Sequence, residues 1–233
     1  MRDRYGRALI VGVGEGLSAA LARLLARAGM KIGLASRSVE KLGPLAAETG
    51  AVTQRCDATS RAEVESLFAA MDQALGGPPE VVIYNASYRV RGPFVGLDPV
   101  EVERALAVSA FGGFLVAQAA AQRMVRAGKG AILFTGASAS VKGYAQSAPF
   151  AMGKFALRGL AQSLARELHP QGIHVAHVVI DGGIRSARRP EPADAPDSLL
   201  DPAAIARSYL DLLNQDRSAW AWEIELRPWV ERF

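Results

Sequence analysis

Residues 8–29 read ALIVGVGEGLSAALARLLARAG, a short apolar run that ends in closely spaced glycines and continues with regularly spaced leucines. Ala8–Val13 has the composition of a buried parallel strand. Leu17–Ala28 carries its apolar residues at helical spacing, and Gly29 is typical of a helix end. Because a strand, a glycine-rich turn and a helix in this order begin a βαβ unit, the stretch predicts an α/β fold.

The same alternation continues along the chain. Further strands are predicted at Lys31–Ala35, Ala51–Arg55, Val81–Tyr84, Ala131–Thr135, Ile173–Ile180 and Ala221–Leu226. Further helices are predicted at Ser38–Glu48 with Ser38 as cap, from Ser60 with Glu63 in the capping-box position, at Asp98–Arg126, at Ser147–Leu168, and from Asp201–Pro202 to Leu213. Right-handed crossovers then give a doubly wound parallel sheet with helices on both faces, a Rossmann-type fold.

We expect residues 1–233 to form a single dinucleotide-binding domain, because this length suits one large α/β unit. Residues 183–201 differ from the rest of the chain, since prolines stand there among Arg, Ala and Asp. This composition predicts irregular structure, either a loop that shapes a substrate pocket or a disordered insert.

Charge and cysteine content favour a soluble cytoplasmic protein. The net charge is only +4, and the one basic cluster, Arg185 with Arg188 and Arg189, is too short to indicate nucleic-acid binding. Cys56 is the single cysteine, which excludes an intrachain disulfide and fits a reducing compartment.

The N-terminus superficially resembles a secretory leader. Arg2, Arg4 and Arg7 precede an apolar stretch, but glycines interrupt that stretch, so we expect no secretory signal. We also expect no membrane association, because the sequence predicts no window long and apolar enough to span a bilayer.

The glycine turn indicates a nucleotide. Glycines at Gly12, Gly14 and Gly16, with Glu15 between them and Leu17 opening the helix, let backbone N–H groups approach a pyrophosphate. The positive end of the helix dipole adds to that attraction. Gly-x-Gly-x-Gly also occurs in methyltransferases and in plain turns, so its position after the first strand is what favours the nucleotide.

The end of the second strand indicates which nucleotide. An acid usually stands there to hold ribose hydroxyls, whereas this strand ends in Ser36 and Arg37. A hydroxyl followed by a guanidinium suits the 2′-phosphate of NADP, since arginine pairs with phosphate bidentately. Glu15 would instead disfavour NADP if it lies near that phosphate. The alternative for Arg37 is a solvent-exposed side chain that binds no cofactor. NADP is therefore favoured over NAD.

Five segments together resemble the short-chain dehydrogenase/reductase family over nearly the whole chain. Gly12-x-x-x-Gly16-x-Ser18 resembles its glycine motif, with Ser18 replacing the last glycine. The other four are the adenine-side acid and its neighbour at Asp57-Ala58, the Asn-Asn-Ala-Gly motif at Tyr84–Ser87 with Asn85 and Ala86 retained, the Tyr-x-x-x-Lys motif at Phe150–Lys154, and the Pro-Gly motif at Asp181-Gly182. The resemblance implies a nicotinamide cofactor held by these residues.

The sequence departs from the family pattern at the catalytic positions. Its catalytic Asn, Ser, Tyr and Lys correspond to Ser109, Ala137, Phe150 and Lys154, with Ser138 adjacent to the serine position. In the family the tyrosine hydroxyl transfers the proton, while the lysine lowers the tyrosine pKa and holds the nicotinamide ribose. The candidate catalytic residues are therefore Lys154, Ser138 and Ser109, although each serine is equally explained by packing or a turn.

Three functions remain open at this point. The first is an NADP-dependent oxidoreductase acting on an unidentified carbonyl or alcohol, whose proton comes from Lys154, Ser138, water or Tyr144. The second is an NADP-binding sensor or partner subunit without turnover. The third is an adenosylmethionine-dependent, methyltransferase-like enzyme, which the missing acid at Ser36 disfavours.

The expected partners are a small-molecule substrate and further copies of the chain. The resemblance implies a homodimer or homotetramer built from the two long helices, where small residues would allow close contact. Those residues are Ala117, Ala120, Ala121, Ala156 and Gly159. We expect no metal site, because the spacing of His169, His174 and His177 matches no metal cluster.

Overall fold

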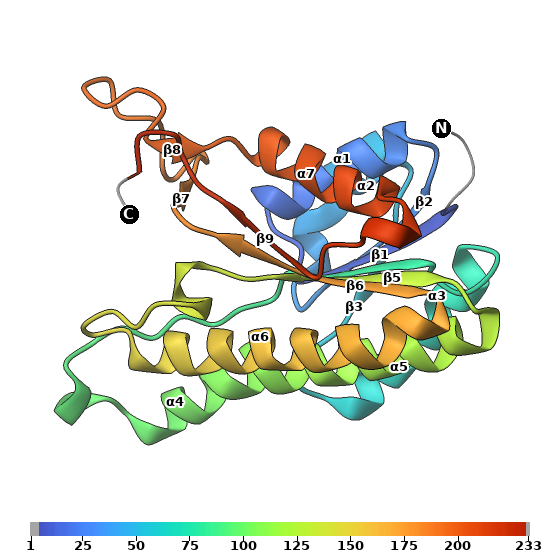
Figure 1. Cartoon of the computed structure of the whole chain (residues 1–233), viewed down its shortest axis with the longest axis horizontal. Coiled ribbons are helices and arrows are strands. Elements are labelled where there is room, and N and C mark those ends of the chain that lie inside the picture. Colours follow the sequence, from blue (N-terminus) through green and yellow to red (C-terminus); the bar gives the residue numbers. More distant parts are fainter. Residues whose placement is uncertain (1–4, 232–233) are drawn as a thin grey trace.

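Seven parallel strands form the centre of the molecule in the order β3-β2-β1-β4-β5-β6-β9 (Figure 1), in a computed structural model that describes residues 5–231. The strands are β1 (Arg7–Val11), β2 (Lys31–Ser36), β3 (Val52–Arg55), β4 (Val81–Tyr84), β5 (Gly130–Thr135), β6 (Ile173–Ile180) and β9 (Glu223–Leu226). The strand order reverses between β1 and β4, which is where open α/β sheets bind their ligands.

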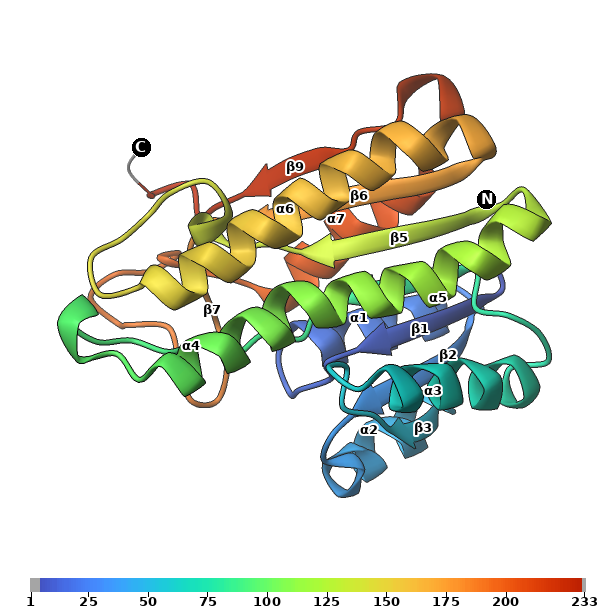
Figure 2. The ribbon, with the colours of Figure 1, turned by 90° about the horizontal axis from the view of Figure 1, so that it is seen from below.

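Helices cover both faces of the sheet, as the alternating pattern predicts (Figures 1 and 2). One face carries α1 (Leu17–Arg27), α2 (Gly43–Thr49) and α7 (Pro202–Asn214). The other carries α3 (Arg61–Ala74), α5 (Gly112–Ala127) and α6 (Ala148–Leu168), and α4 (Pro99–Leu106) leads into α5. The predicted Rossmann-type, doubly wound fold is confirmed.

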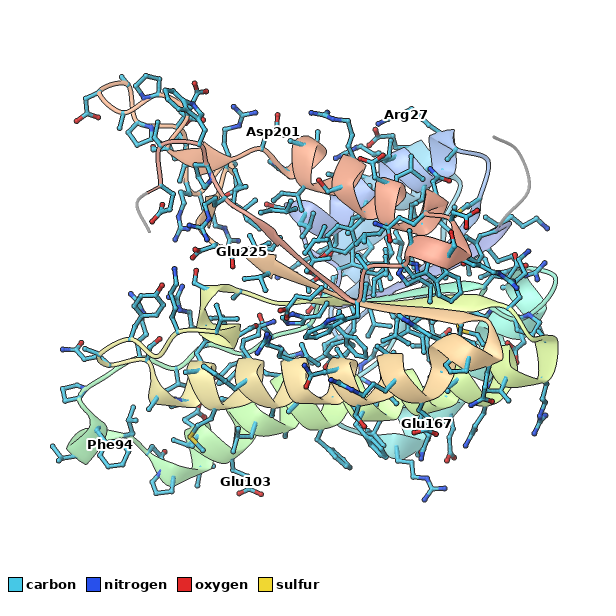
Figure 3. All side chains as sticks on the ribbon, viewed as in Figure 1. Arg27, Phe94, Glu103, Glu167, Asp201 and Glu225 are labelled. Carbon is cyan, nitrogen blue, oxygen red and sulfur yellow. The ribbon has the colours of Figure 1, made fainter. Side chains whose placement is uncertain are left out.

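The core consists of two apolar layers, one on each side of the sheet. Successive residues of a strand point to opposite faces, so Leu9 and Ile10 of β1 belong to different layers. Every residue of β5 and β6 is buried, which explains why both strands are mostly apolar, although β6 also buries His174 and His177. Charged side chains such as Arg27 and Glu167 lie on the outer surfaces of the helix layers (Figure 3).

Two helix starts differ from the sequence prediction. Ser38 makes no capping hydrogen bond, and the predicted helix Ser38–Glu48 divides into a 3₁₀ turn, Val39–Leu42, and α2. A proline in the first turn of α2 lacks an N–H and therefore suits a new helix start there. At α3, Ser60 accepts from the N–H of Glu63, but the Glu63 carboxylate accepts from Asp57 rather than completing the capping box.

The predicted long helix Asp98–Arg126 is interrupted by a π-helical segment, Ala107–Phe111. By length and composition, Pro99–Ala127 is long and apolar enough to cross a membrane, so the expectation that no window reaches that length was wrong. Half of its apolar window is buried inside the protein, as in a core helix of a soluble protein. Packing on the sheet accounts for the buried half of these apolar side chains.

The region 183–201 is closed at its base by two short parallel strands, β7 (Gly183–Ile184) and β8 (Leu199–Leu200). Asp201 then caps α7 through the N–H of Ala203. At the other terminus, Arg2 and Arg4 lie outside the described residues, whereas Arg7 begins the central strand β1.

Candidate functional site

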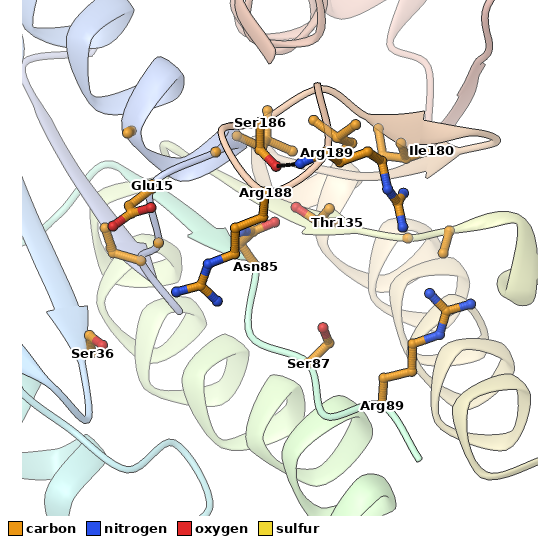
Figure 4. Close-up of a pocket in the computed structure, with 18 of the residues that line it drawn as sticks. Glu15, Ser36, Asn85, Ser87, Arg89, Thr135, Ile180, Ser186, Arg188 and Arg189 are labelled. Atoms are coloured by element: carbon orange, nitrogen blue, oxygen red, sulfur yellow. Dashed lines mark hydrogen bonds between the residues drawn. The ribbon is translucent and has the colours of Figure 1, made fainter. Parts of the chain in front are cut away.

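Two adjoining cavities lie at the carboxyl ends of the strands, with volumes of about 820 and 280 Å³. Figure 4 shows the larger one. The loops after β1, β2 and β4 line both cavities. The loop after β3 lines the smaller one, and the loops after β5 and β6 line the larger one. This is the expected location of a ligand site in a parallel sheet.

The geometry of the glycine turn explains its glycines. Gly12 has φ +88°, and a Cβ there would lie 2.3 Å from the backbone nitrogen of Ala86, so the turn packs directly on the loop after β4. Gly14 and Gly16 line both cavities, and a Cβ on either would meet no protein atom within 4 Å. The open side of the turn thus leaves room for a pyrophosphate beside the first N–H groups of α1, and the site fits a dinucleotide.

Hydrogen bonds of Ser18 and Asn85 hold this turn against the end of the sheet. Asn85 donates to Ser18 Oγ at 2.6 Å, and Ser18 Oγ donates to the carbonyl of Gly12 at 3.1 Å. The N–H of Asn85 also bonds to the carbonyl of Val11. The serine that replaces the last glycine of the family motif is thus a positioning residue, a role the sequence analysis missed.

The smaller cavity holds Ser36, Arg37, Asp57, Ala58 and Ala86 together. Burial alone would raise the pKa of Asp57, but two hydrogen bonds from Thr59 and the charges of Arg37 and Arg55 hold it below its usual value. Glu15 lines the larger cavity and not this one.

Lys154 is the one charged side chain buried at the larger cavity, with 3% of its surface exposed. Its ammonium donates to the carbonyl of Thr135 at 2.7 Å and lies 5.9 Å from the centre of the Phe150 ring. Burial lowers the pKa of Lys154 from 10.5 to about 8. The sequence resemblance predicts that Phe150 stands at the family's tyrosine position, where its ring would offer no proton.

Ser138 lines the larger cavity, but its hydroxyl is already engaged. It bonds to the carboxylate of Asp181, which also pairs with Lys142 at 3.1 Å and Arg227 at 3.3 Å. Burial would raise the pKa of Asp181, whereas these bonds and charges bring it below its usual value. Ala137, which the sequence resemblance predicts at the family's serine position, lines the cavity without a polar side chain.

Ser109 does not line either cavity. Its side chain is fully buried in the π-helical segment, 2.7 Å from where a Cβ on Gly153 would lie, and it accepts a weak bond from the N–H of Tyr88. Tyr84 donates its hydroxyl to the carbonyl of Val108 within the same segment. The structure therefore assigns Ser109 to packing between α6 and the loop after β4.

Several sequence candidates are thus brought together. Gly14, Gly16, Leu17, Ser36 and Asn85 line both cavities, and Gly182 lines the larger one with Lys154. Tyr144, which the sequence left as a surface residue or a proton donor, also lines the larger cavity and is 49% exposed.

Comparison with known proteins agrees with this geometry. A family model described as short chain dehydrogenase matches residues 7–192. An uncharacterized oxidoreductase of Staphylococcus aureus (strain N315) is 27% identical over 227 residues, which cover 95% of this chain and 96% of that protein. The 3-oxoacyl-[acyl-carrier-protein] reductase MabA of Mycobacterium bovis is 30% identical over 176 residues, or 76% of this chain and 68% of the reductase.

Solved structures extend the similarity to three dimensions. A short-chain dehydrogenase from Rhodopseudomonas palustris has 34% identity and a TM-score of 0.83, covering 97% of this chain and 100% of its own. A metagenomic short-chain oxidoreductase in complex with NADP has 26% identity and a TM-score of 0.82, with 96% and 97% coverage. Fold and site define a dinucleotide-binding α/β protein. The chain belongs to the short-chain dehydrogenase/reductase family of oxidoreductases.

Proposed function

We propose that this protein is an NADP-dependent oxidoreductase for a small carbonyl compound or alcohol, with an altered catalytic set. The observation that carries the cofactor preference is the smaller cavity, where Ser36 and Arg37 stand without a carboxylate at the end of β2. Glu15, which could have repelled a 2′-phosphate, lines only the other cavity. The NADP complex of the metagenomic relative agrees with this choice.

The cofactor would be held from several strand ends. Gly12–Leu17 would cradle the pyrophosphate, Asp57 and Ala58 the adenine, and Asn85, Ala86, Lys154 and Gly182 the nicotinamide half. A bound nicotinamide supplies or accepts a hydride. The protein supplies a buried ammonium at Lys154, next to the ring of Phe150.

A second candidate is an NADP-binding sensor or partner subunit that does not turn over. Phe150 and Ala137 carry no hydroxyl, the hydroxyl of Ser138 is bonded to Asp181, and Ser109 lies outside the cavities. The remaining proton sources are Lys154, Tyr144 and water. The third candidate, a methyltransferase-like enzyme, was wrong, because the family match is to short chain dehydrogenases.

Calorimetric titration with NADPH and NADH in parallel tests the proposal. We expect micromolar binding of NADPH and much weaker binding of NADH. Arg37→Gln should weaken NADPH binding roughly 10- to 100-fold and leave NADH unchanged, because a hydrogen bond to a charged group contributes about 1.5–3 kcal/mol. Arg61→Gln, on the exposed side of α3, is the matched control. Binding of neither cofactor would refute the oxidoreductase assignment.

Turnover separates the first two candidates. Purified protein with NADPH and a panel of aldehydes and ketones should show slow NADPH oxidation. Cofactor binding without oxidation at high protein concentration would favour the sensor. If turnover is found, Tyr144→Phe tests the tyrosine that lines the cavity, and an unchanged rate would remove it from the mechanism.

We also propose a homodimer or homotetramer in the cytoplasm. Apolar side chains stay exposed on the outer faces of α5 and α6, among them Phe114, Met152 and Phe155. Of the small residues expected at the helix pairing, Ala117 and Ala120 are buried within the protein, whereas Ala156 and Gly159 are exposed and could contact a partner. Light scattering at micromolar concentration tests this, and a monomeric mass would count against it.

A further inference from the structure

The larger cavity is strongly cationic. Its lining includes six basic side chains, Arg23, Lys41, Arg89, Lys154, Arg188 and Arg189, and one acidic side chain, Glu15. Arg23 is neutralised by Glu48 at 2.8 Å, outside the cavity. Such an excess of unpaired positive charge in a concave site attracts anions.

Two of these arginines converge at the end of the cavity that holds Phe150. Arg89 follows β4, whereas Arg189 comes from the loop after β7, and their guanidinium groups extend toward one another from opposite walls (Figure 4). Within residues 5–231, no carboxylate forms an ion pair with either group. Burial, Arg91 and Arg189 together lower the pKa of Arg89, so these like charges repel one another in the ligand-free protein.

Both arginines are held in place by neighbouring groups. The guanidinium of Arg89 stacks on Phe150, 5.0 Å from the ring centre. Arg189 is bonded through its backbone N–H to Ser186, and its Nη1 lies 2.8 Å from where a Cβ on Gly183 would stand. The loop that carries Arg189 is anchored by the pairing of β7 with β8 and by Arg185, which pairs with Asp201.

From this geometry we propose that Arg89 and Arg189 bind an anionic substituent of the substrate, a carboxylate or a phosphate, beside the ring of Phe150. The inference rests on the proposed oxidoreductase function and names its substrate class: a small carbonyl compound or alcohol that carries an acidic group. Guanidinium groups pair with both anions through two parallel N–H···O bonds. Arg37, which would hold the 2′-phosphate of the cofactor, lines only the smaller cavity, where neither arginine lies. The glycine turn lines both cavities, and Glu15 of that turn lies across the larger cavity from Arg89 and Arg189 (Figure 4).

Calorimetric titration of NADPH-saturated protein with citrate and, separately, with inorganic phosphate tests the site at constant ionic strength. We expect one anion per chain to bind, with affinity falling roughly 10- to 100-fold in Arg89→Gln and in Arg189→Gln. Arg89→Lys, which keeps the charge, should recover part of the loss, and Arg61→Gln should bind like wild type. Tighter binding of citrate would identify a carboxylate, and tighter binding of phosphate a phosphate group.

Two results would overturn the proposal. Equal anion affinity in wild type and both glutamine variants would show that the arginine pair holds no anion. Loss of NADPH affinity by a similar factor in those variants would assign the pair to the cofactor phosphates. Failure of wild type to bind NADPH would refute the proposed function instead, and the anion titrations on the cofactor-free variants would still decide the role of the pair.

Discussion

Replacing Lys154 with methionine should stabilise the ligand-free protein at neutral pH. The lysine is 3% exposed, and none of the carboxylates in residues 5–231 forms an ion pair with it. Burial lowers its pKa from 10.5 to about 8, which means that the folded protein holds the lysine proton less tightly than the unfolded chain does. The charged form of Lys154 therefore opposes folding.

The size of the effect follows from that pKa. A fall from 10.5 to about 8 corresponds to about 3 kcal/mol of folding free energy at pH 7, at about 1.4 kcal/mol for each pH unit. Methionine fills a similar volume without a charge, but it loses the bond to the Thr135 carbonyl, which offsets about 1–2 kcal/mol. We therefore expect Lys154→Met to raise the free energy of unfolding by about 1–2 kcal/mol at pH 7.

The pH dependence of this stability difference identifies the buried charge of Lys154 as its cause. Below pH 8 Lys154 is charged in both states, so the full cost of burying the charge is present. Between about pH 8 and 10.5 the folded protein has lost the proton that the unfolded chain still binds, so wild-type stability rises with pH. Methionine does not titrate, and its advantage should shrink by about 2 kcal/mol from pH 7 to pH 9.5.

Urea unfolding followed by tryptophan fluorescence measures the difference at both pH values. Lys31→Met, which replaces an exposed lysine of β2, is the control and should show no such pH-dependent difference. If the gap between Lys154→Met and wild type were the same at pH 7 and pH 9.5, burial of the ammonium would not be its origin. The variant should also bind NADPH more weakly, since the resemblance places this lysine on the nicotinamide ribose.

Three further outcomes are expected. Phe150→Tyr, with its hydroxyl one helical turn from Lys154, should raise the rate of NADPH oxidation with a carbonyl panel roughly 10²- to 10⁴-fold; an unchanged rate would place the proton source elsewhere. Burial lowers the pKa of His177 from 6.5 to about 4, although the bond to Glu223 acts to raise it. The unfolded chain therefore binds this proton first, and the stability of the folded protein should fall as the pH drops from about 6.5 to about 4. Urea unfolding of His177→Gln should lack that part of the loss. Phe114→Asp should lower the mass measured by light scattering, because it places a charge on an exposed apolar face of α5.

Local patterns were sufficient to predict the architecture. Each strand of the sheet is a short apolar run, and each crossover helix starts near a recognisable signal, such as Asp201 before Pro202 at α7. The glycine turn could also be predicted from the sequence, because Gly12 meets a backbone requirement that only glycine can meet. These features depend on residues close together in the sequence.

The missed features depend on contacts between distant residues. The π-helical segment is stabilised by Tyr84, which reaches Val108 from 24 positions earlier in the chain. Similarly, the hydroxyl of Ser138 is engaged because Asp181 from another loop lies beside it. A serine near a motif position could be named from the sequence, but whether its hydroxyl faces a cavity, a carboxylate or the core could not.

Two unfavourable arrangements of charge lie at this edge of the sheet. Lys154 is a buried charge, Arg89 faces Arg189, and no carboxylate within residues 5–231 forms an ion pair with any of the three. A dinucleotide and an anionic substrate both bring negative oxygens to this region, so each ligand would relieve a repulsion that is present in the free protein. Binding should therefore stabilise the fold in proportion to ligand affinity and concentration. Such departures from ordinary packing rules mark a candidate functional site.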